Sequence, residues 1–168
     1  KNIYKKEILM NSNNVKNSYE KYLVFKLKNE NYAIKILDVK EIIAMTKITE
    51  VPNSPSYVKG IINLRGTIVP AIDLRSKFNF SEKEYDRQTN IVIGLIGKEA
   101  IGLIIDQSTG VSNIKKEDLS TPPKFGAQIN SSFIEAVAKK GEEVIMILDI
   151  KKIFSTEEFK NIQAISEE

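Results

Sequence analysis

The sequence predicts a mainly β protein built from small barrels. Three observations favour this class over a parallel sheet with crossover helices. Apolar segments of strand length follow one another along the chain, turn residues separate them at close spacing, and the stretches with a helical pattern are short and peripheral. With 168 residues and 42% hydrophobic residues, the chain is able to bury a core without a metal or a disulfide.

A tail and a hairpin are predicted at the start of the chain. Residues 1–19 are rich in Asn and Lys and predict a flexible tail. Residues 22–27 place Leu23, Phe25 and Leu27 on one face of a strand, residues 32–36 continue this period of two, and residues 29–31 supply a turn between them. We therefore expect an antiparallel hairpin as the first ordered element.

A short helix is predicted after this hairpin. Asp38 is a good N-cap, and Val39, Ile42 and Ile43 follow at helical spacing. Packing in the core is enough to explain these apolar side chains. Val39 is also a candidate for a position that lies partly in the core and partly in a groove at the surface. Residues 48–51 predict another short strand.

Residues 60–74 predict two strands joined by a tight turn. The strands meet at Arg65 and Gly66, where glycine takes a positive φ at little cost. Asn63 is placed to satisfy backbone groups near this turn. Gly66 and Asn63 are therefore expected to have structural roles.

The end of the second strand carries two further signals. Pro70 has no backbone N–H, so its strand is expected to be bulged there or to lie at a sheet edge. Asp73 predicts the cap of a helical turn that ends at Phe78. Residues 79–90 are polar and charged, which is typical of a linker or mobile loop.

The second half of the chain repeats these elements. Asp149 predicts the cap of a closing helix that extends to about residue 165, and residues 156–168 form a C-terminal helical extension in this scheme. Before it, we expect a hairpin at 91–96 and 100–106, a short strand at 111–114, a loop at 120–132, and a last hairpin at 133–137 and 144–148.

Two stretches of the sequence resemble each other. Residues 69–78 and 145–154 each contain an apolar strand, an aspartate, a basic residue and a phenylalanine one turn later, and the hairpins at 22–36 and 91–105 also match in pattern. One interpretation is that any strand-to-helix junction has this pattern. The other is that two related barrels lie side by side, with an apolar groove between them that suits a partner helix.

Missing residue types argue against several classes of enzyme. The chain has no Cys and no His, so it has no disulfide, thiolate nucleophile, Ser-His-Asp triad or histidine metal site. An enzyme that uses two carboxylates needs both acids in one cleft, and we interpret Asp73 and Asp149 as structural helix caps instead. We expect no catalytic activity, no metal and no cofactor.

Charge and hydropathy bear on the partners and the location of the protein. The net charge of +3 is a small difference between 25 basic and 22 acidic residues, which is a weak argument for nucleic acid. The longest apolar run, residues 91–96, is too short for a membrane span, and no signal peptide is visible. We expect a cytoplasmic protein without membrane insertion.

One segment carries a resemblance to a known family. Residues 60–74 read G-x-x-N-x-R-G-x-x-x-P-x-x-D-L, which resembles the signature of the CheW family of bacterial chemotaxis adaptors. Residues 38–42 resemble the D-V-x-E-I element of that family, and residues 101–106 and 144–154 resemble its later strands. The resemblance covers about residues 20–155, which we take as the CheW-like domain.

The resemblance implies a fold and a function. It implies two packed SH3-like barrels of five strands each, with short peripheral helices and a C-terminal helix. It also implies an adaptor that couples the cytoplasmic tips of chemoreceptors to the regulatory domain of the histidine kinase CheA at receptor arrays, without a cofactor.

The resemblance also implies binding residues. Receptor binding is expected at Val39, Glu41, Gly60 and Arg65, and kinase binding is expected at four apolar residues. These four residues are Ile48, Val51, Ile61 and Leu64.

Simpler interpretations remain for some of these residues and for the function. Arg65 alone reads as a solvated turn arginine, and Gly60 reads as a glycine needed by the backbone. The same domain occurs in CheV and in other chemosensory pathways. A small barrel that binds single-stranded nucleic acid is the alternative from a different class.

Overall fold

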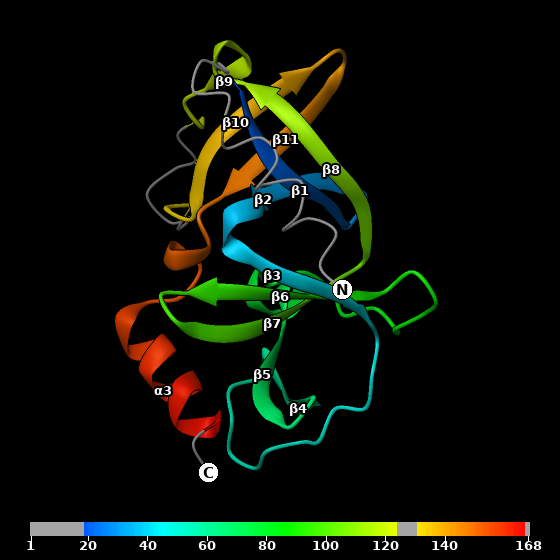
Figure 1. Ribbon diagram of the computed structural model, residues 1–168, viewed down its shortest axis with the longest axis vertical. Coiled ribbons are helices and arrows are strands. Elements are labelled where there is room, and N and C mark those ends of the chain that lie inside the picture. The colour runs from blue at the N-terminus through cyan, green and yellow to red at the C-terminus, as the bar shows by residue number, and fades with distance from the viewer. Residues whose placement is uncertain (1–18, 124–130, 167–168) are drawn as a thin grey trace.

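The computed structural model describes residues 19–123 and 131–166, and its strands form two sheets stacked along the long axis of the molecule (Figure 1). The mainly β class with short helices, predicted from the sequence, is confirmed. The predicted tail falls almost entirely outside the described residues. None of the described helices is long and apolar enough to cross a membrane.

The sheet at the top of Figure 1, barrel A, contains both the first and the last strands. Its order is β8-β1-β2-β11-β10-β9, so it has six strands where five were expected, because the two-residue strand β9 adds to its edge. The strands are β1 (Tyr19–Leu27), β2 (Glu30–Lys35), β8 (Gln107–Lys115), β9 (Leu119–Ser120), β10 (Ile134–Lys140) and β11 (Glu143–Leu148).

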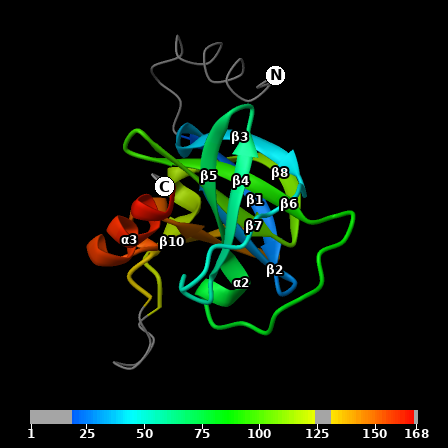
Figure 2. The same ribbon diagram turned by 90° about the horizontal axis from the view of Figure 1, so that it is seen from below.

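The lower sheet, barrel B, has the order β3-β6-β7-β5-β4 and is seen from its own end in Figure 2. Its strands are β3 (Val39–Ala44), β4 (Val58–Leu64), β5 (Thr67–Asp73), β6 (Asn90–Ile96) and β7 (Glu99–Ile105). The helices are η1 (Ile36–Asp38), η2 (Lys116–Asp118), η3 (Ile150–Lys152), α2 (Leu74–Lys77) and α3 (Thr156–Ser166).

The sequence repeat corresponds to a repeat in topology. In barrel A the hairpin β1–β2 is extended by β11, which runs parallel to β2; in barrel B the hairpin β6–β7 is extended by β5, which runs parallel to β7. The strand after each hairpin then crosses over, because β3 pairs with β6 and β8 pairs with β1. Barrel B is therefore inserted in the chain between β2 and β8 of barrel A, and the two barrels are not consecutive.

The apolar residues form three clusters, one inside each barrel and a larger one between them. On β1, Tyr22 and Val24 point into barrel A, whereas Leu23, Phe25 and Leu27 pack between the barrels. Both faces of such a strand are buried, which explains its nearly continuous apolar sequence. The apolar groove expected between the barrels is therefore mostly filled as core.

Two predicted elements are wrong. The helix predicted from Asp38 is instead the 3-10 turn η1 followed by strand β3, in which Ile42 pairs with Val92. The β-branched residues of this segment favour a strand, and their helical spacing is coincidental. The short strand predicted at 48–51 is reduced to one bridge, between Thr49 and Ile61.

Pro70 lies in β5, an interior strand of the sheet order, but at Pro70 itself this strand is paired only with β4, so the expected edge position holds locally. Its partner on β4, Ile61, exchanges both backbone hydrogen bonds with Thr49 on the other side. The ladder from β5 to β7 begins only at Ala71. The missing N–H of Pro70 therefore removes no ladder hydrogen bond at this position.

The closing helix is in two parts. Asp149 caps only η3, accepting a hydrogen bond from the N–H of Lys151 at 3.1 Å. A second cap starts α3: Ser155 Oγ accepts from the Glu158 N–H, and the Glu158 carboxylate accepts from the Ser155 N–H. The sequence pattern S-x-x-E at this point was the signal for a second helix start.

Hydrogen bonds hold the polar segment at 79–90 against barrel B. The Tyr85 hydroxyl donates to Asp73 Oδ2 at 2.7 Å, and Thr89 is buried beside the Asp86 turn. The prediction of a connecting loop is right, but its side chains are engaged in specific hydrogen bonds.

An ion pair links the two barrels. Arg75 donates two hydrogen bonds, of 2.7 and 2.6 Å, to the two carboxylate oxygens of Asp106, which also accepts from the backbone N–H of Lys28 in the β1–β2 turn. Burial raises the pKa of Asp106, but these hydrogen bonds outweigh burial, and the pKa lies below its ordinary value. The charged form of Asp106 is therefore stabilised in the fold.

Asp106→Asn is expected to lower the free energy of unfolding at pH 7 by about 1–2 kcal/mol, because it removes the negative charge and one of the two oxygens that accept from Arg75. The contribution of the charge is fully present above the unfolded pKa, about 3.9, and is lost as pH falls through the lower folded pKa. The difference between wild type and variant should therefore shrink in strong acid. Urea titrations at pH 7 and about pH 3 measure both effects, and exposed Asp118→Asn, which should change neither value, is the control.

Candidate functional site

The turn between β4 and β5 has an unusual backbone. Arg65 has φ +50° and Gly66 has φ +89°, so both central residues of the two-residue turn lie in the left-handed region. Asn63 Oδ1 accepts a hydrogen bond from the Gly66 N–H at 2.7 Å. Gly66 and Asn63 thus have the geometry of structural residues, and Arg65 occupies a position that Asn or Gly would adopt more readily.

Arg65 is held by Glu41 across the barrel. Glu41 lies on β3 and Arg65 directly follows β4, and these two strands stand at opposite ends of the strand order of barrel B. Nevertheless, Arg65 Nη2 lies 2.6 Å from Glu41 Oε2. The hydrogen bond from Arg65 lowers the pKa of Glu41, and the nearby positive charge adds to this effect. The Arg65 side chain remains 68% exposed, against 19% for Glu41. The pair therefore presents a fixed guanidinium at the surface.

Glu41 carries an unsatisfied atom. Its second oxygen, Oε1, is buried and has no hydrogen-bond partner within the described part of the chain. The β3–β6 register shifts between Val39 and Glu41, and Val39 itself is buried in the core between the barrels. A left-handed arginine and an unpaired buried oxygen both cost stability. Such costs concentrate at functional sites.

Gly60 lies on β4, five residues before Arg65, and serves the backbone. It is buried, has φ +146°, and lies against the Thr49 backbone, so that an added Cβ would sit 2.6 Å from the Thr49 carbonyl carbon. Thr49 and Ile61 exchange hydrogen bonds of 2.9 and 2.8 Å. Gly60 thereby lets the segment that carries Ile48 and Val51 approach β4.

The four residues predicted for kinase binding lie along this segment and β4. Ile48, Val51 and Ile61 are half-buried and form part of the barrel B surface. Leu64 is buried in the barrel B core. Direct contact with a partner is therefore open to the first three residues, and Leu64 supports the surface from below.

Asp73 is fully occupied as a cap. Its Oδ1 accepts from the N–H groups of Arg75 and Ser76, and its Oδ2 accepts from the Tyr85 hydroxyl. A carboxylate held in this way has a structural role, as the sequence suggested. Asp149 makes the equivalent contact in barrel A.

Arg65→Asn is expected to change the urea midpoint of unfolding only slightly, because asparagine adopts a positive φ more readily than arginine while the hydrogen bond that lowers the pKa of Glu41 is lost. The same variant should bind partners more weakly, since the guanidinium is lost. A urea titration measures the first effect and a binding titration the second. A variant that is much less stable than wild type would show that Arg65 is retained for the fold.

Comparisons with known proteins give one result. The CheW-like domain model matches residues 21–158. The chain is 33% identical to the chemotaxis protein CheW of Klebsiella aerogenes, over 88% of this chain and 89% of that protein, and 32% identical to CheW of Treponema pallidum, over 83% and 85%. The crystal structure of the scaffolding protein TtCheW from Thermoanaerobacter tengcongensis is similar, with a TM-score of 0.76 at 33% identity, covering 82% of this chain and 94% of that one. The chain belongs to the CheW family of chemotaxis scaffold proteins, and its two sheets are the SH3-like barrels of that family.

Proposed function

We propose that this protein is a non-catalytic adaptor in the cytoplasm that couples the tips of chemoreceptors to the histidine kinase CheA at membrane-associated receptor arrays. Membership of the CheW family supports this role. The observation that carries it is the exposed, left-handed Arg65 held by Glu41 at a cost to stability. A guanidinium held at the surface by a backbone that favours asparagine or glycine is best explained by a partner.

Arg65 is suited to receptor contact. It donates one hydrogen bond to Glu41 within the described residues, which leaves other N–H groups of the guanidinium for carboxylates or carbonyls of a partner. Gly60 and Val39 act from beneath in this proposal, because both are buried. Glu41 fixes the direction of the arginine.

Kinase contact is assigned to the neighbouring half-buried apolar residues Ile48, Val51 and Ile61. Half-exposed aliphatic side chains next to an ion pair give an interface an apolar centre with a polar rim. The CheA regulatory domain is the partner proposed for this surface.

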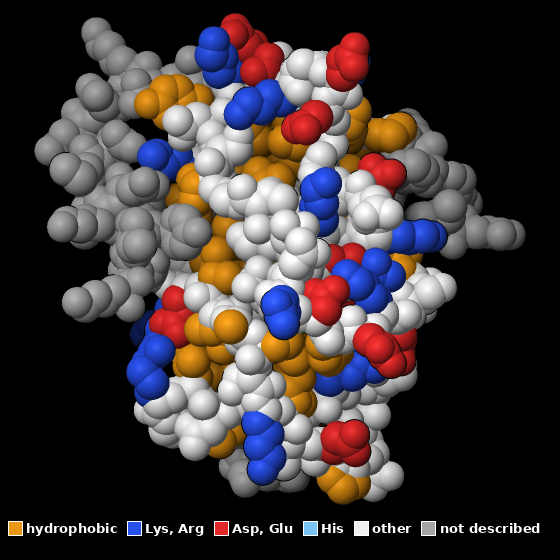
Figure 3. All heavy atoms as spheres, turned by 90° about the vertical axis from the view of Figure 1, so that its right-hand side faces the viewer, with side chains coloured by type: hydrophobic (Ala, Val, Ile, Leu, Met, Phe, Trp, Pro, Cys, Tyr) orange, Lys and Arg blue, Asp and Glu red, His pale blue; other side chains and the backbone are white. Residues whose placement is uncertain are grey.

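The face of the molecule drawn in Figure 3 does not favour nucleic acid. Figure 3 shows that positive and negative side chains are interspersed on the face that carries β8, with apolar areas between them. A protein that binds nucleic acid through phosphates normally gathers its basic residues on one face.

Co-sedimentation tests the proposed coupling. Receptor cytoplasmic fragments arrayed on vesicles, the CheA kinase and this protein are mixed, and the kinase in the pellet is measured with and without this protein. We expect the protein to enter the pellet and to raise both the amount and the activity of the sedimented kinase. Kinase recruitment that is unchanged by the protein would contradict the proposal.

A further inference from the structure

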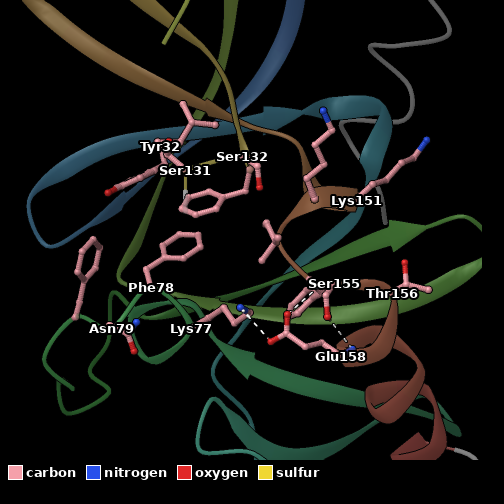
Figure 4. A pocket seen from close by; sticks show the side chains of 16 residues that line it. Tyr32, Lys77, Phe78, Asn79, Ser131, Ser132, Lys151, Ser155, Thr156 and Glu158 are labelled. Carbon is pink, nitrogen blue, oxygen red and sulfur yellow. Dashed lines mark hydrogen bonds and ion pairs between the residues drawn. The ribbon is translucent and has the colours of Figure 1, made fainter. Parts of the chain in front are cut away.

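A cavity of about 1010 Å³ opens where the two barrels and the start of α3 meet (Figure 4). Its walls come from β2, from α2 and the residues after it, from the start of β10, and from the segment that joins η3 to α3. Neither Glu41 nor Arg65 lines it. The cavity is thus separate from the surface proposed above for the receptor.

Aromatic rings form one wall of the cavity. Phe78 and Phe133 are stacked, with ring centroids 4.6 Å apart and planes 7° apart, and Phe80 meets Phe78 edge to face at 6.1 Å. Tyr32 lies 6.2 Å from Phe78 on the core side. The three phenylalanines are only half-buried. A wall of partly exposed rings gains most from a further large apolar side chain.

The charged residues around the cavity are mainly positive. Lys77, Lys151, Lys152 and Glu158 line it. Glu158 is neutralised by Lys77, whose Nζ lies 3.3 Å from its carboxylate, a contact drawn in Figure 4. Lys151 and Lys152 are exposed, and neither forms an ion pair with another described residue. The charge of Lys151 also acts on nearby Asp38, where it opposes the rise in pKa that burial causes. The excess charge at this cavity is therefore positive and comes mainly from Lys152.

We propose that this cavity is a second docking site, which receives a short acidic segment of a partner protein. One bulky apolar side chain of that segment packs on Phe78 and Phe133, and flanking carboxylates face Lys151 and Lys152. The apolar contact supplies most of the affinity, and the charges select acidic over basic segments.

The absence of tryptophan from the chain makes the test direct, because any tryptophan signal then comes from the probe. The probe is a twelve-residue peptide with one central Trp flanked on each side by Glu and Asp. We expect its fluorescence to change on titration with the protein, and a peptide with Lys in place of the acids to bind at least about tenfold more weakly. An acidic peptide with Ser in place of Trp should fail to compete.

Matched variants locate the site. The double variant Lys151→Glu, Lys152→Glu should weaken binding of the acidic peptide about tenfold. The control is Lys139→Glu with Lys140→Glu, an equivalent pair on the β10–β11 hairpin, and it should leave the affinity for this peptide unchanged. Arg65→Glu should also leave it unchanged, which separates this site from the receptor surface. Circular dichroism checks that each variant is folded.

Three results would overturn the proposal. The first is equal binding of the acidic and basic peptides to the wild-type protein. The second is an equal loss of binding in the two lysine-pair variants. The third is binding of anionic lipid vesicles through Lys151 and Lys152 in the absence of any peptide binding, which would make the charge a membrane contact.

Discussion

Gly60→Ala is expected to lower the free energy of unfolding by about 3 kcal/mol, because the backbone at φ +146° is strained for alanine and the Thr49–Ile61 hydrogen bonds must break or lengthen. The new Cβ would lie 2.6 Å from the Thr49 carbonyl carbon, and it would fall inside the contact distance of the carbonyl oxygen. Backbone atoms form this obstacle, so no side-chain rotation relieves it. Urea titration followed by circular dichroism measures the change.

Gly66→Ala is the matched control for this prediction. Gly66 has φ +89°, but no atom lies within 4 Å of an added Cβ. Its replacement by alanine should therefore lower the free energy of unfolding by only about 1 kcal/mol, which is the cost of a positive φ for alanine. Equal losses at the two glycines would show that the packing of Thr49 against β4 contributes nothing. Receptor coupling lost by Gly60→Ala is accordingly expected to follow from disturbed structure.

Arg65→Glu is expected to weaken receptor coupling at least about tenfold while the protein stays folded. The substitution removes the exposed guanidinium and places a second carboxylate beside Glu41, so the two like charges repel. Because Arg65 lies in an exposed turn, little packing is lost. Co-sedimentation of the variant with arrayed receptor fragments measures the coupling, and circular dichroism checks the fold.

A control and a rescue sharpen this test. Arg87→Glu changes the same charge on the exposed loop between α2 and β6 and should leave coupling intact. The double variant Glu41→Arg with Arg65→Glu restores the ion pair with its ends exchanged. If the guanidinium at position 65 itself contacts the receptor, receptor coupling stays weak in the double variant. If the ion pair only joins the two ends of the barrel B sheet, the double variant regains coupling. Full coupling by the single variant Arg65→Glu would show that the receptor site is elsewhere.

Local sequence signals predicted the hairpins and the turns well. These signals depend on interactions between residues that are close in the sequence. They are the strand pattern of β1 and β2, the glycine of the Arg65–Gly66 turn and the Asp73 cap. The residues of the Glu41–Arg65 pair were named from the family resemblance, and their contact joins residues 24 positions apart. No local pattern predicts such a contact.

The errors have physical causes. In β3, apolar residues happened to follow helical spacing, and pairing with β6 decided the outcome. The docking cavity was missed because Phe78 and Phe133 are brought together only by tertiary structure. The groove expected between the barrels is mostly core, and the nearly continuous apolar run of β1 was the signal that both of its faces are covered.

The insertion of barrel B within the chain of barrel A has a consequence for the order of folding. All five strands of barrel B lie between Val39 and Ile105, whereas barrel A needs β1 from one end of the described chain and β11 from the other. During synthesis, barrel B is therefore complete while barrel A still lacks its closing hairpin. The slow step of refolding should be the return of β11 to β2, which closes the longest loop in the molecule.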